Sequence, residues 1–252
     1  MKRVFFGLSL GAIACTMALQ FPATAIAKGR ETVLHSFGNG TDGAAPVAGL
    51  VDVKGTLYGT TAYGGAGSAN NCQDGALCGT VFAVDASTGA ETVLHSFGGS
   101  ADGTLPYASL IDVKDTLYGT TSYGGAHGDG TVFSLDLGTG TETVLYSFCR
   151  HPVHHQCRDG EFPVAGLIDV NGALYGTTDL GGVYQDQIPS SNRVLFVLDP
   201  NTGAETVLYA FRSRRDGTNP GASLIDVVGT LYGTTQAGGT HHDRGTVFAF
   251  KP

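Results

Sequence analysis

Histidine and aspartate residues lie close together at two points of the sequence, where they could hold a metal ion. His127 is followed by Asp129, and the pair His241 and His242 is followed by Asp243. Imidazole and carboxylate groups are common ligands of transition metals, and a metal held by His127, His241 and His242 would suit a hydrolase or a lyase. The alternative is that these are solvated loop residues. The sequence has no nucleophile motif, phosphate-binding glycine loop or cofactor signature, so no cofactor is expected.

Four cysteines lie beyond residue 27, and their spacing favours two disulfide bonds. Cys72 and Cys78 are six residues apart, and Cys149 and Cys157 are eight residues apart. Four cysteines allow three pairings, of which the short separations favour Cys72 with Cys78 and Cys149 with Cys157. Three histidines between Cys149 and Cys157 also give spacings that a zinc site could use. In an oxidising compartment the disulfide is the expected outcome.

Aromatic and basic side chains in the loops offer a different kind of site. Tyrosine and histidine present flat apolar surface with a hydrogen-bonding tip, which suits the binding of a glycan or a protein. The candidate ligand-binding residues are Tyr63, Tyr107, Tyr123, His127, Tyr184, Arg214, His241 and His242. The chain has no tryptophan, which weakens the case for a glycan because stacking on sugars commonly uses that residue.

These candidates lie between short segments that recur four times. ETVLHSF at residue 31 returns with small changes at 91, 142 and 205, and GLVDV at 49 returns in similar form at 109, 166 and 223. LYGTT begins at 57, 117, 174 and 231, and GTVF at 79, 130 and 245, with RVLF at 193 in the remaining repeat. Each segment is rich in β-branched and aromatic residues and is bounded by turn-forming residues, which predicts β-strands.

Four strands in every 57 to 60 residues are typical of the blades of a β-propeller. We expect an all-β, four-bladed β-propeller, with the GLVDV-type segment innermost, followed by LYGTT, GTVF and the outermost ETVLHSF. The last blade lacks its own outer strand, and Glu31–Phe37 precedes the first complete blade. Glu31–Phe37 is therefore expected to complete the last blade and close the ring. The alternative is that the chain is half of a homodimeric eight-bladed ring.

Loop lengths distinguish the two faces of this propeller. From the inner Leu to the LYGTT Tyr the spacing is always 8, and from the GTVF or RVLF Phe to the ETVLHSF Phe it is always 15. The two other connections vary, with spacings of 24, 15, 21 and 16, and of 13, 13, 19 and 13. In an up-and-down blade both variable loops emerge on one side. That face carries the candidate residues and is the predicted binding face.

Two further sets of repeated residues are expected to be structural. Aspartates followed by glycine, and by proline a little further on, are predicted to form turns; these are Asp42, Asp102, Asp159 and Asp216. His35 and His95 are replaced by Tyr146 and Tyr209 in the other repeats, which predicts packing residues on the outer strands.

The run DGAAPVAGLVDVKGTLYGTTAYGGAG, followed downstream by GTVFAVD, resembles the GloVer tandem repeat of secreted or surface-anchored bacterial proteins. The resemblance recurs four times and covers residues 31–250. It implies a propeller-like β-fold and export, and it implies no particular chemistry.

The amino terminus also predicts export. Two basic residues precede an uncharged apolar run, Val4 to Leu19, and the small-residue pattern Ala25-Ile26-Ala27. This is typical of a signal peptide over residues 1–27, which leaves one propeller domain over residues 28–252. The mature protein would be secreted or periplasmic, and small residues before Cys15 leave a lipid-anchored form as the alternative.

Beyond the leader the chain has 12 basic and 22 acidic residues, a formal net charge of −10. This excludes binding to nucleic acid or to an anionic membrane by charge, because both depend on Lys and Arg. We therefore expect an exported, non-catalytic binding or scaffold module whose partner is an envelope or extracellular glycan or protein. The alternatives are a metal-dependent hydrolase or lyase at the mouth of the propeller channel and a purely structural surface repeat.

Overall fold

The computed structural model describes residues 29–38, 40–66, 78–98, 101–150, 152–153, 156–182, 193–211, 215–240 and 243–252. The chain divides into two compact units, residues 1–32 and 33–252, and every strand belongs to the second. The regular structure of the residues described is entirely β. None of them belongs to a helix that could cross a membrane.

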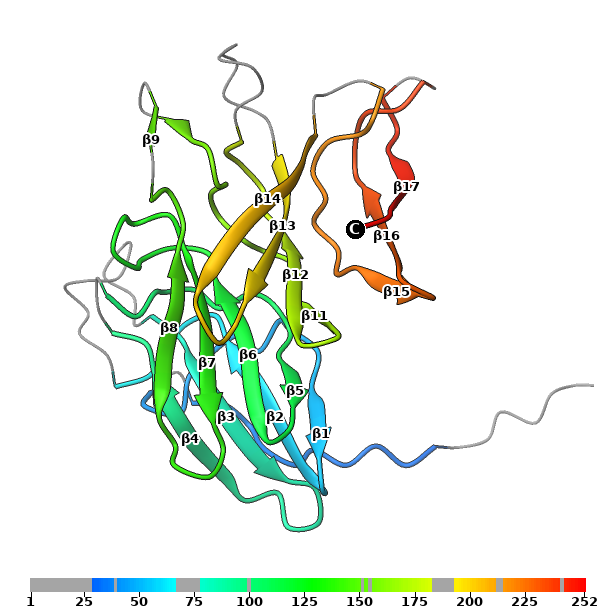
Figure 1. Ribbon diagram of the computed structural model, residues 1–252. Helices are drawn as coiled ribbons and strands as arrows, with labels where there is room; N and C mark the ends of the chain where they lie inside the picture. Colours follow the sequence, from blue (N-terminus) through cyan, green and yellow to red (C-terminus); the bar gives the residue numbers. More distant parts are fainter. Residues whose placement is uncertain are drawn as a thin grey trace, which may run out of the picture. The chain divides into compact units, whose positions relative to one another are not determined.

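Four antiparallel sheets follow one another along the chain (Figure 1). The first sheet contains β1 (Val51–Val53), β2 (Thr56–Thr61), β3 (Thr80–Asp85) and β4 (Glu91–Ser96). The second contains β5 (Ile111–Val113), β6 (Thr116–Thr121), β7 (Thr131–Asp136) and β8 (Glu142–Ser147). The third contains β11 (Ile168–Val170), β12 (Ala173–Thr177), β13 (Arg193–Asp199) and β14 (Ala204–Phe211). The fourth contains β15 (Ile225–Val227), β16 (Thr230–Thr235) and β17 (Thr246–Phe250).

The strands of each sheet pair in chain order, as the repeated segments predict. The fold is therefore propeller-like, with one sheet for each repeat. A short hairpin that the sequence did not predict, β9 (Pro152–Val153) with β10 (Gln156–Cys157), lies in the insertion between the second and third sheets.

The glycine of each LYGTT segment makes room for a phenylalanine ring. In the third sheet Gly176 pairs with Phe196 across β12 and β13. A Cβ at Gly176 would lie 2.6 Å from Phe196 Cζ and 2.9 Å from Leu167 Cδ2. The same close approach occurs at the corresponding glycine of the other three sheets. This steric requirement explains why the segment keeps a glycine within a strand.

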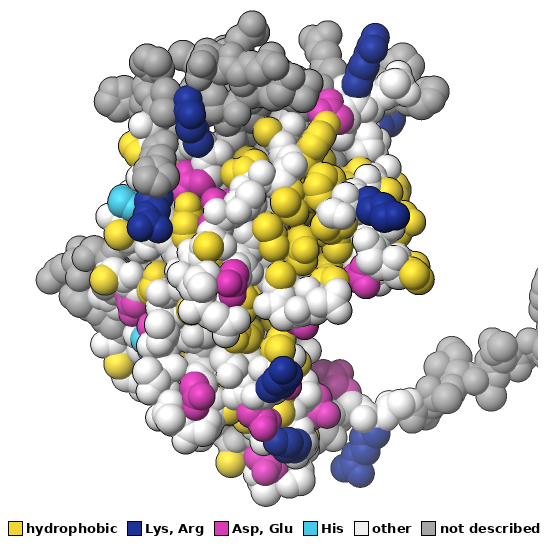
Figure 2. All heavy atoms as spheres, viewed as in Figure 1, with side chains coloured by type: hydrophobic (Ala, Val, Ile, Leu, Met, Phe, Trp, Pro, Cys, Tyr) yellow, Lys and Arg dark blue, Asp and Glu magenta, His cyan; other side chains and the backbone are white. Residues whose placement is uncertain are grey.

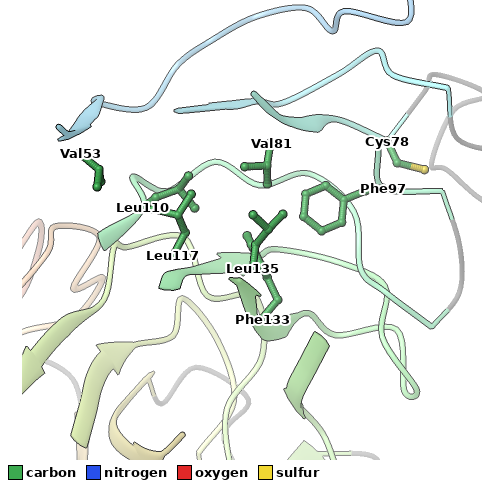
Figure 3. Close-up of a cluster of buried hydrophobic side chains, with 8 residues drawn as sticks. All are labelled: Val53, Cys78, Val81, Phe97, Leu110, Leu117, Phe133 and Leu135. Atoms are coloured by element: carbon green, nitrogen blue, oxygen red, sulfur yellow. The ribbon is translucent and has the colours of Figure 1, made fainter. Parts of the chain in front are cut away.

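Successive sheets pack through hydrophobic clusters, the first of which is shown in Figure 3. Its centre is an edge-to-face pair between Phe97, which follows β4, and Phe133 of β7, with ring centroids 5.2 Å apart. Phe148 and Phe196 form the same pair at the next junction at 5.2 Å, and Phe211 and Phe248 at the last at 5.0 Å. The core of the residues described is thus divided among three junctions between neighbouring sheets.

The predicted pairing of Glu31–Phe37 with the last blade is not seen in the part of the chain that is described. The fourth sheet contains three strands, and residues 31–38 are assigned to no strand. Phe37 nevertheless packs on Phe82 of β3, with ring centroids 4.9 Å apart. A strand needs the edge of another strand to satisfy its backbone groups, and side-chain packing on a sheet face does not supply one.

Candidate ligand-binding face

Backbone bridges hold the two variable loops of each repeat together. Ala44 pairs with Tyr63 through two hydrogen bonds of 2.8 and 3.0 Å, and Thr104 pairs with Tyr123 through bonds of 2.7 and 3.1 Å. Equivalent bridges join the same two loops in the third and fourth repeats. The loop tyrosines therefore stand on a fixed backbone, as a preformed binding surface requires.

Four aromatic residues on these loops form what we call the aromatic cluster: Tyr63, Tyr107, Tyr123 and Phe162. The hydroxyl groups of Tyr63 and Tyr107 are 3.2 Å apart, and the rings of Tyr123 and Phe162 are 4.7 Å apart. Burial, followed by the hydrogen bond with Tyr63, raises the pKa of Tyr107 to about 12, and Tyr123 adds to the rise. Tyr63 is 39% exposed. The cluster thus combines accessible ring surface with a Tyr107 hydroxyl group that remains protonated at neutral pH.

Phe162 occupies a backbone position that recurs in every repeat with a different side chain. The residues before the loop proline are Ala45, Leu105, Phe162 and Asn219, and all have φ between 55° and 59°. Each carbonyl accepts a hydrogen bond of 3.0 or 3.1 Å from the facing loop. A left-handed φ is unfavourable for Leu and Phe, so these loop contacts must hold it in place. A constant backbone with a variable side chain suits recognition. Phe162 could not be recognised from the sequence, because no residue-type pattern marks it.

A second arrangement, also missed from the sequence, recurs where neighbouring sheets meet. His95 Nε2 lies 3.2 Å from Asp102 Oδ2, and Tyr146 donates a 2.6 Å hydrogen bond to Asp159 Oδ2. Tyr209 donates to Asp216 in the same way at 2.7 Å. The repeated aspartates therefore bond an outer-strand side chain in addition to shaping a turn. The signal in the sequence was the exchange of His for Tyr, which keeps a hydrogen-bond donor at that position.

Two of these pairs each adjoin a half-buried glutamate that comes from the next sheet. Burial raises the pKa of Glu142, near His95 and Asp102, to about 7. Burial, followed by the negative charge of Asp159, raises the pKa of Glu205 to about 8. One oxygen of each of the two glutamates is buried and has no hydrogen-bond partner among the residues that the structure describes. Because the arrangement repeats from junction to junction, we assign it to the joining of sheets.

Two grooves lie beside this arrangement, and Tyr146 and Arg150 line both of them. The larger, of about 610 Å³, is lined by Arg150, Arg158, Asp159 and Glu205 among others. The smaller, of about 280 Å³, is lined by His127 and also reaches Arg150. His127 thus lies at the wall of a groove.

Of the predicted metal ligands, the structure describes His127, Asp129 and Asp243. Asp129 lies close to Cys149 and Cys157, but those sulfur atoms are joined in a disulfide and offer no thiolate to a metal. Asp243 Oδ1 accepts a 2.6 Å hydrogen bond from Gly238 N within its own loop. His241 and His242 lie outside the described residues, as do the ligand candidates Tyr184 and Arg214. The metal site remains a prediction.

The cysteines agree with the predicted pairing where the structure describes them. Cys149 is joined to Cys157. Cys78 is also disulfide-bonded, whereas Cys72, its predicted partner, lies outside the described residues. Disulfides of this kind fit an oxidising compartment.

Comparison with known families identifies the repeats. The family profile described as the Gloeobacter/Verrucomicrobia repeat matches residues 21–187 and 151–252, which together span all four sheets. This confirms the resemblance found in the sequence. No curated protein matches the chain.

Solved structures also resemble this chain. The extracellular domain of a one-component system from B. thetaiotaomicron matches 88% of this chain with a TM-score of 0.52 and 14% sequence identity, and the match covers 22% of that structure's chain. A chain of a nidogen/laminin complex matches 79% of this chain and 60% of its own, with a TM-score of 0.45 and 12% identity. An α-L-arabinofuranosidase from Clostridium thermocellum matches 80% of this chain and 66% of its own, with a TM-score of 0.41 and 16% identity. At such identities the first match indicates a shared fold alone.

Proposed function

Because the chain belongs to the Gloeobacter/Verrucomicrobia repeat family, we propose that it is an exported, non-catalytic binding module of the bacterial envelope or exterior. Its ligand is a glycan or a protein held on the face formed by the variable loops. The sheets are blades of a propeller, and the sequence of residues 31–37, taken from this chain or from a second copy, supplies the fourth strand that the last blade lacks.

The aromatic cluster is the observation that carries this proposal. Tyr63 and Tyr107 present hydroxyl groups that can donate to a ligand, and Tyr123 with Phe162 adds apolar ring surface. Rings held on a bridged backbone lose little conformational entropy when a ligand stacks on them. This surface suits the apolar faces of sugar rings or the side chains of a protein partner.

Export is supported by the disulfide chemistry. Cys149 and Cys157 are joined, and Cys78 is bonded as well, in a chain whose leader resembles a signal peptide. Expression of the full precursor followed by cell fractionation tests this part. Recovery of the protein in the cytoplasm with free thiols would contradict it.

The test of binding compares the mature protein with a Tyr63→Ser, Tyr107→Ser, Tyr123→Ser variant on glycan arrays and against solubilised envelope proteins. We expect a partner that binds the unmodified protein and loses at least tenfold in affinity with the variant. Val228→Ser is the matched control, because Val228 is a fully exposed apolar residue in the turn at the opposite end of the strands. Equal binding by all three proteins would refute the aromatic cluster as the site.

A further inference from the structure

Some apolar positions of the repeat are buried where two sheets meet but exposed at the two ends of the series of four sheets. Val247 of β17 is 78% exposed, whereas the residues at the same place in the first and second repeats, Val81 and Val132, are fully buried. Leu50, before β1, is 55% exposed, whereas Leu110 and its counterparts in the later repeats are almost entirely buried. Figure 2 shows the hydrophobic side chains gathered over the last sheet and the neighbouring β13 and β14. Each end therefore presents the surface that an adjoining sheet covers elsewhere.

A groove of about 350 Å³ accompanies the exposed surface of β17. It is lined by every residue of Thr246–Phe250, together with Tyr209 and Phe211 of the third sheet. In the first three sheets the strand equivalent to β17 has a fourth strand along its free edge. Among the described residues no strand pairs with this edge of β17. An unpaired strand edge beside a largely apolar groove is a site for the addition of another strand.

The sequence that fits this edge is present at the other end of the chain. Residues 31–37 read ETVLHSF, identical to residues 91–97 around β4, and residues 245–249 read GTVFA, identical to residues 79–83 around β3. In the first sheet these two sequences pair, with Thr80 opposite Ser96, Val81 opposite His95 and Phe82 opposite Val93.

The same register can be transferred to residues 31–37 and 245–249, which do not pair with each other in the structure. It places Thr246 opposite Ser36, Val247 opposite His35 and Phe248 opposite Val33. Val33 is 68% exposed, so it is open to such pairing. The molecule thus already contains the strand pair that this edge would form.

The geometry of the junctions decides which copy of the chain supplies the strand. Three Phe pairs at the junctions between sheets have centroid distances of 5.0 to 5.2 Å and interplanar angles of 67° to 70°. The pair between Phe37 and Phe82 is nearly the same, at 4.9 Å and 65°. Residues 33–37 therefore already pack on the first sheet as the end of an outer strand does. With four sheets joined in this uniform way, Val33, Leu50 and Val247 all stay exposed, so the two ends do not cover each other within one chain.

We propose that two copies of this chain associate head to tail, with β17 of each copy pairing with residues 33–36 of the other. Each copy contributes one end of each kind, so the two contacts are identical and the assembly is closed by twofold symmetry. Both exposed ends become buried, and the free edge of β17 in each copy gains a partner. This assembly is independent of what the loop face binds.

Cysteine cross-linking tests the register and the copy that supplies the strand. His35→Cys and Val247→Cys are made as separate proteins, and directly opposed strand residues have Cβ atoms close enough for a disulfide. We expect an equimolar mixture, exchanged and then oxidised, to give a covalent dimer on a non-reducing gel. Neither variant alone, nor the unmodified chain, should give this band. Val33→Cys mixed with Val247→Cys is the off-register control and should cross-link far less.

A protein carrying both His35→Cys and Val247→Cys separates the two ways of filling the edge. A covalent dimer supports association of two copies, whereas an internal disulfide in a monomer would overturn it in favour of a ring closed within one chain. Light scattering on the unmodified mature protein should give twice the mass of one chain, and Val247→Glu should reduce that mass to one chain while the circular dichroism of the strands is kept. A strictly monomeric unmodified protein that gives no cross-link would also overturn the proposal.

Discussion

Replacing Glu205 by glutamine should make the stability of the protein less dependent on pH. Burial beside Asp159 raises the pKa of Glu205 from 4.5 to about 8 in the folded chain. An acid with a higher pKa in the folded state binds more protons there than in the unfolded state, so the free energy of unfolding falls as the pH rises. The contribution of Glu205 is present in full below about pH 4.5 and is lost as the pH rises through about 8.

The size of the effect follows from this difference in pKa. Each pKa unit corresponds to about 1.4 kcal/mol, so the full difference would amount to about 5 kcal/mol above pH 9. Glu205 is only half-buried, and solvent screens its charge, so we expect roughly 2 kcal/mol. Glu205→Gln should match the unmodified protein at pH 5 within about 0.5 kcal/mol and exceed it by roughly 2 kcal/mol at pH 9.

Urea denaturation followed by circular dichroism at pH 5, 7 and 9, with the disulfides intact, measures this difference. Glu91→Gln is the matched control, because Glu91 occupies the same place in the first repeat and has a more modestly raised pKa. Its gain at pH 9 should be smaller. If the unmodified protein and Glu205→Gln lose stability equally between pH 5 and pH 9, the assignment of a buried, protonated Glu205 is refuted.

Two further predictions concern the packing at Gly176 and the disulfide between Cys149 and Cys157. Gly176→Ala should lower the free energy of unfolding by about 1 to 3 kcal/mol, because its methyl group would overlap Phe196. Thermal denaturation measures this loss. Gly38→Ala is the control that should change little, because its methyl group would have ordinary contacts at 3.6 Å. A Cys149→Ser, Cys157→Ser variant should lose about 2 to 3 kcal/mol, since the bond closes a short loop; an unchanged urea midpoint would show that this bond does not constrain the unfolded chain.

The strands were predictable because the same series of strand-forming segments recurs in four repeats. Even RVLF at 193, which departs from GTVF, forms β13 in the expected place. The pairing of Cys149 with Cys157 was also predictable, since their short separation favours local closure. The hairpin β9–β10 was not, because it occurs in one insertion without a repeated counterpart.

The behaviour of residues 31–37 could not be predicted from their own sequence. An identical sequence forms a strand at 91–96, where β3 offers an edge. In the described part of the chain residues 31–37 pair with no strand edge, so tertiary context overrides the strand preference. The aromatic cluster was found only in part for a related reason. Tyrosines can be selected by type and loop position, but Phe162 joins Tyr123 through a left-handed backbone that its sequence disfavours.

The division of the core among junctions has a consequence for how the protein opens and how it could change in length. In such a linear array, stability is the sum of terms for single repeats and for contacts between neighbours. The second and third sheets each have two neighbouring sheets within one copy, whereas the first and fourth have one. Once two copies have separated, opening should therefore begin at the outer sheets of each copy and proceed inward. A repeat inserted between two others would form junctions of the kind already present and leave the remaining ones unaltered, so whole repeats are the units by which such a chain can lengthen or shorten.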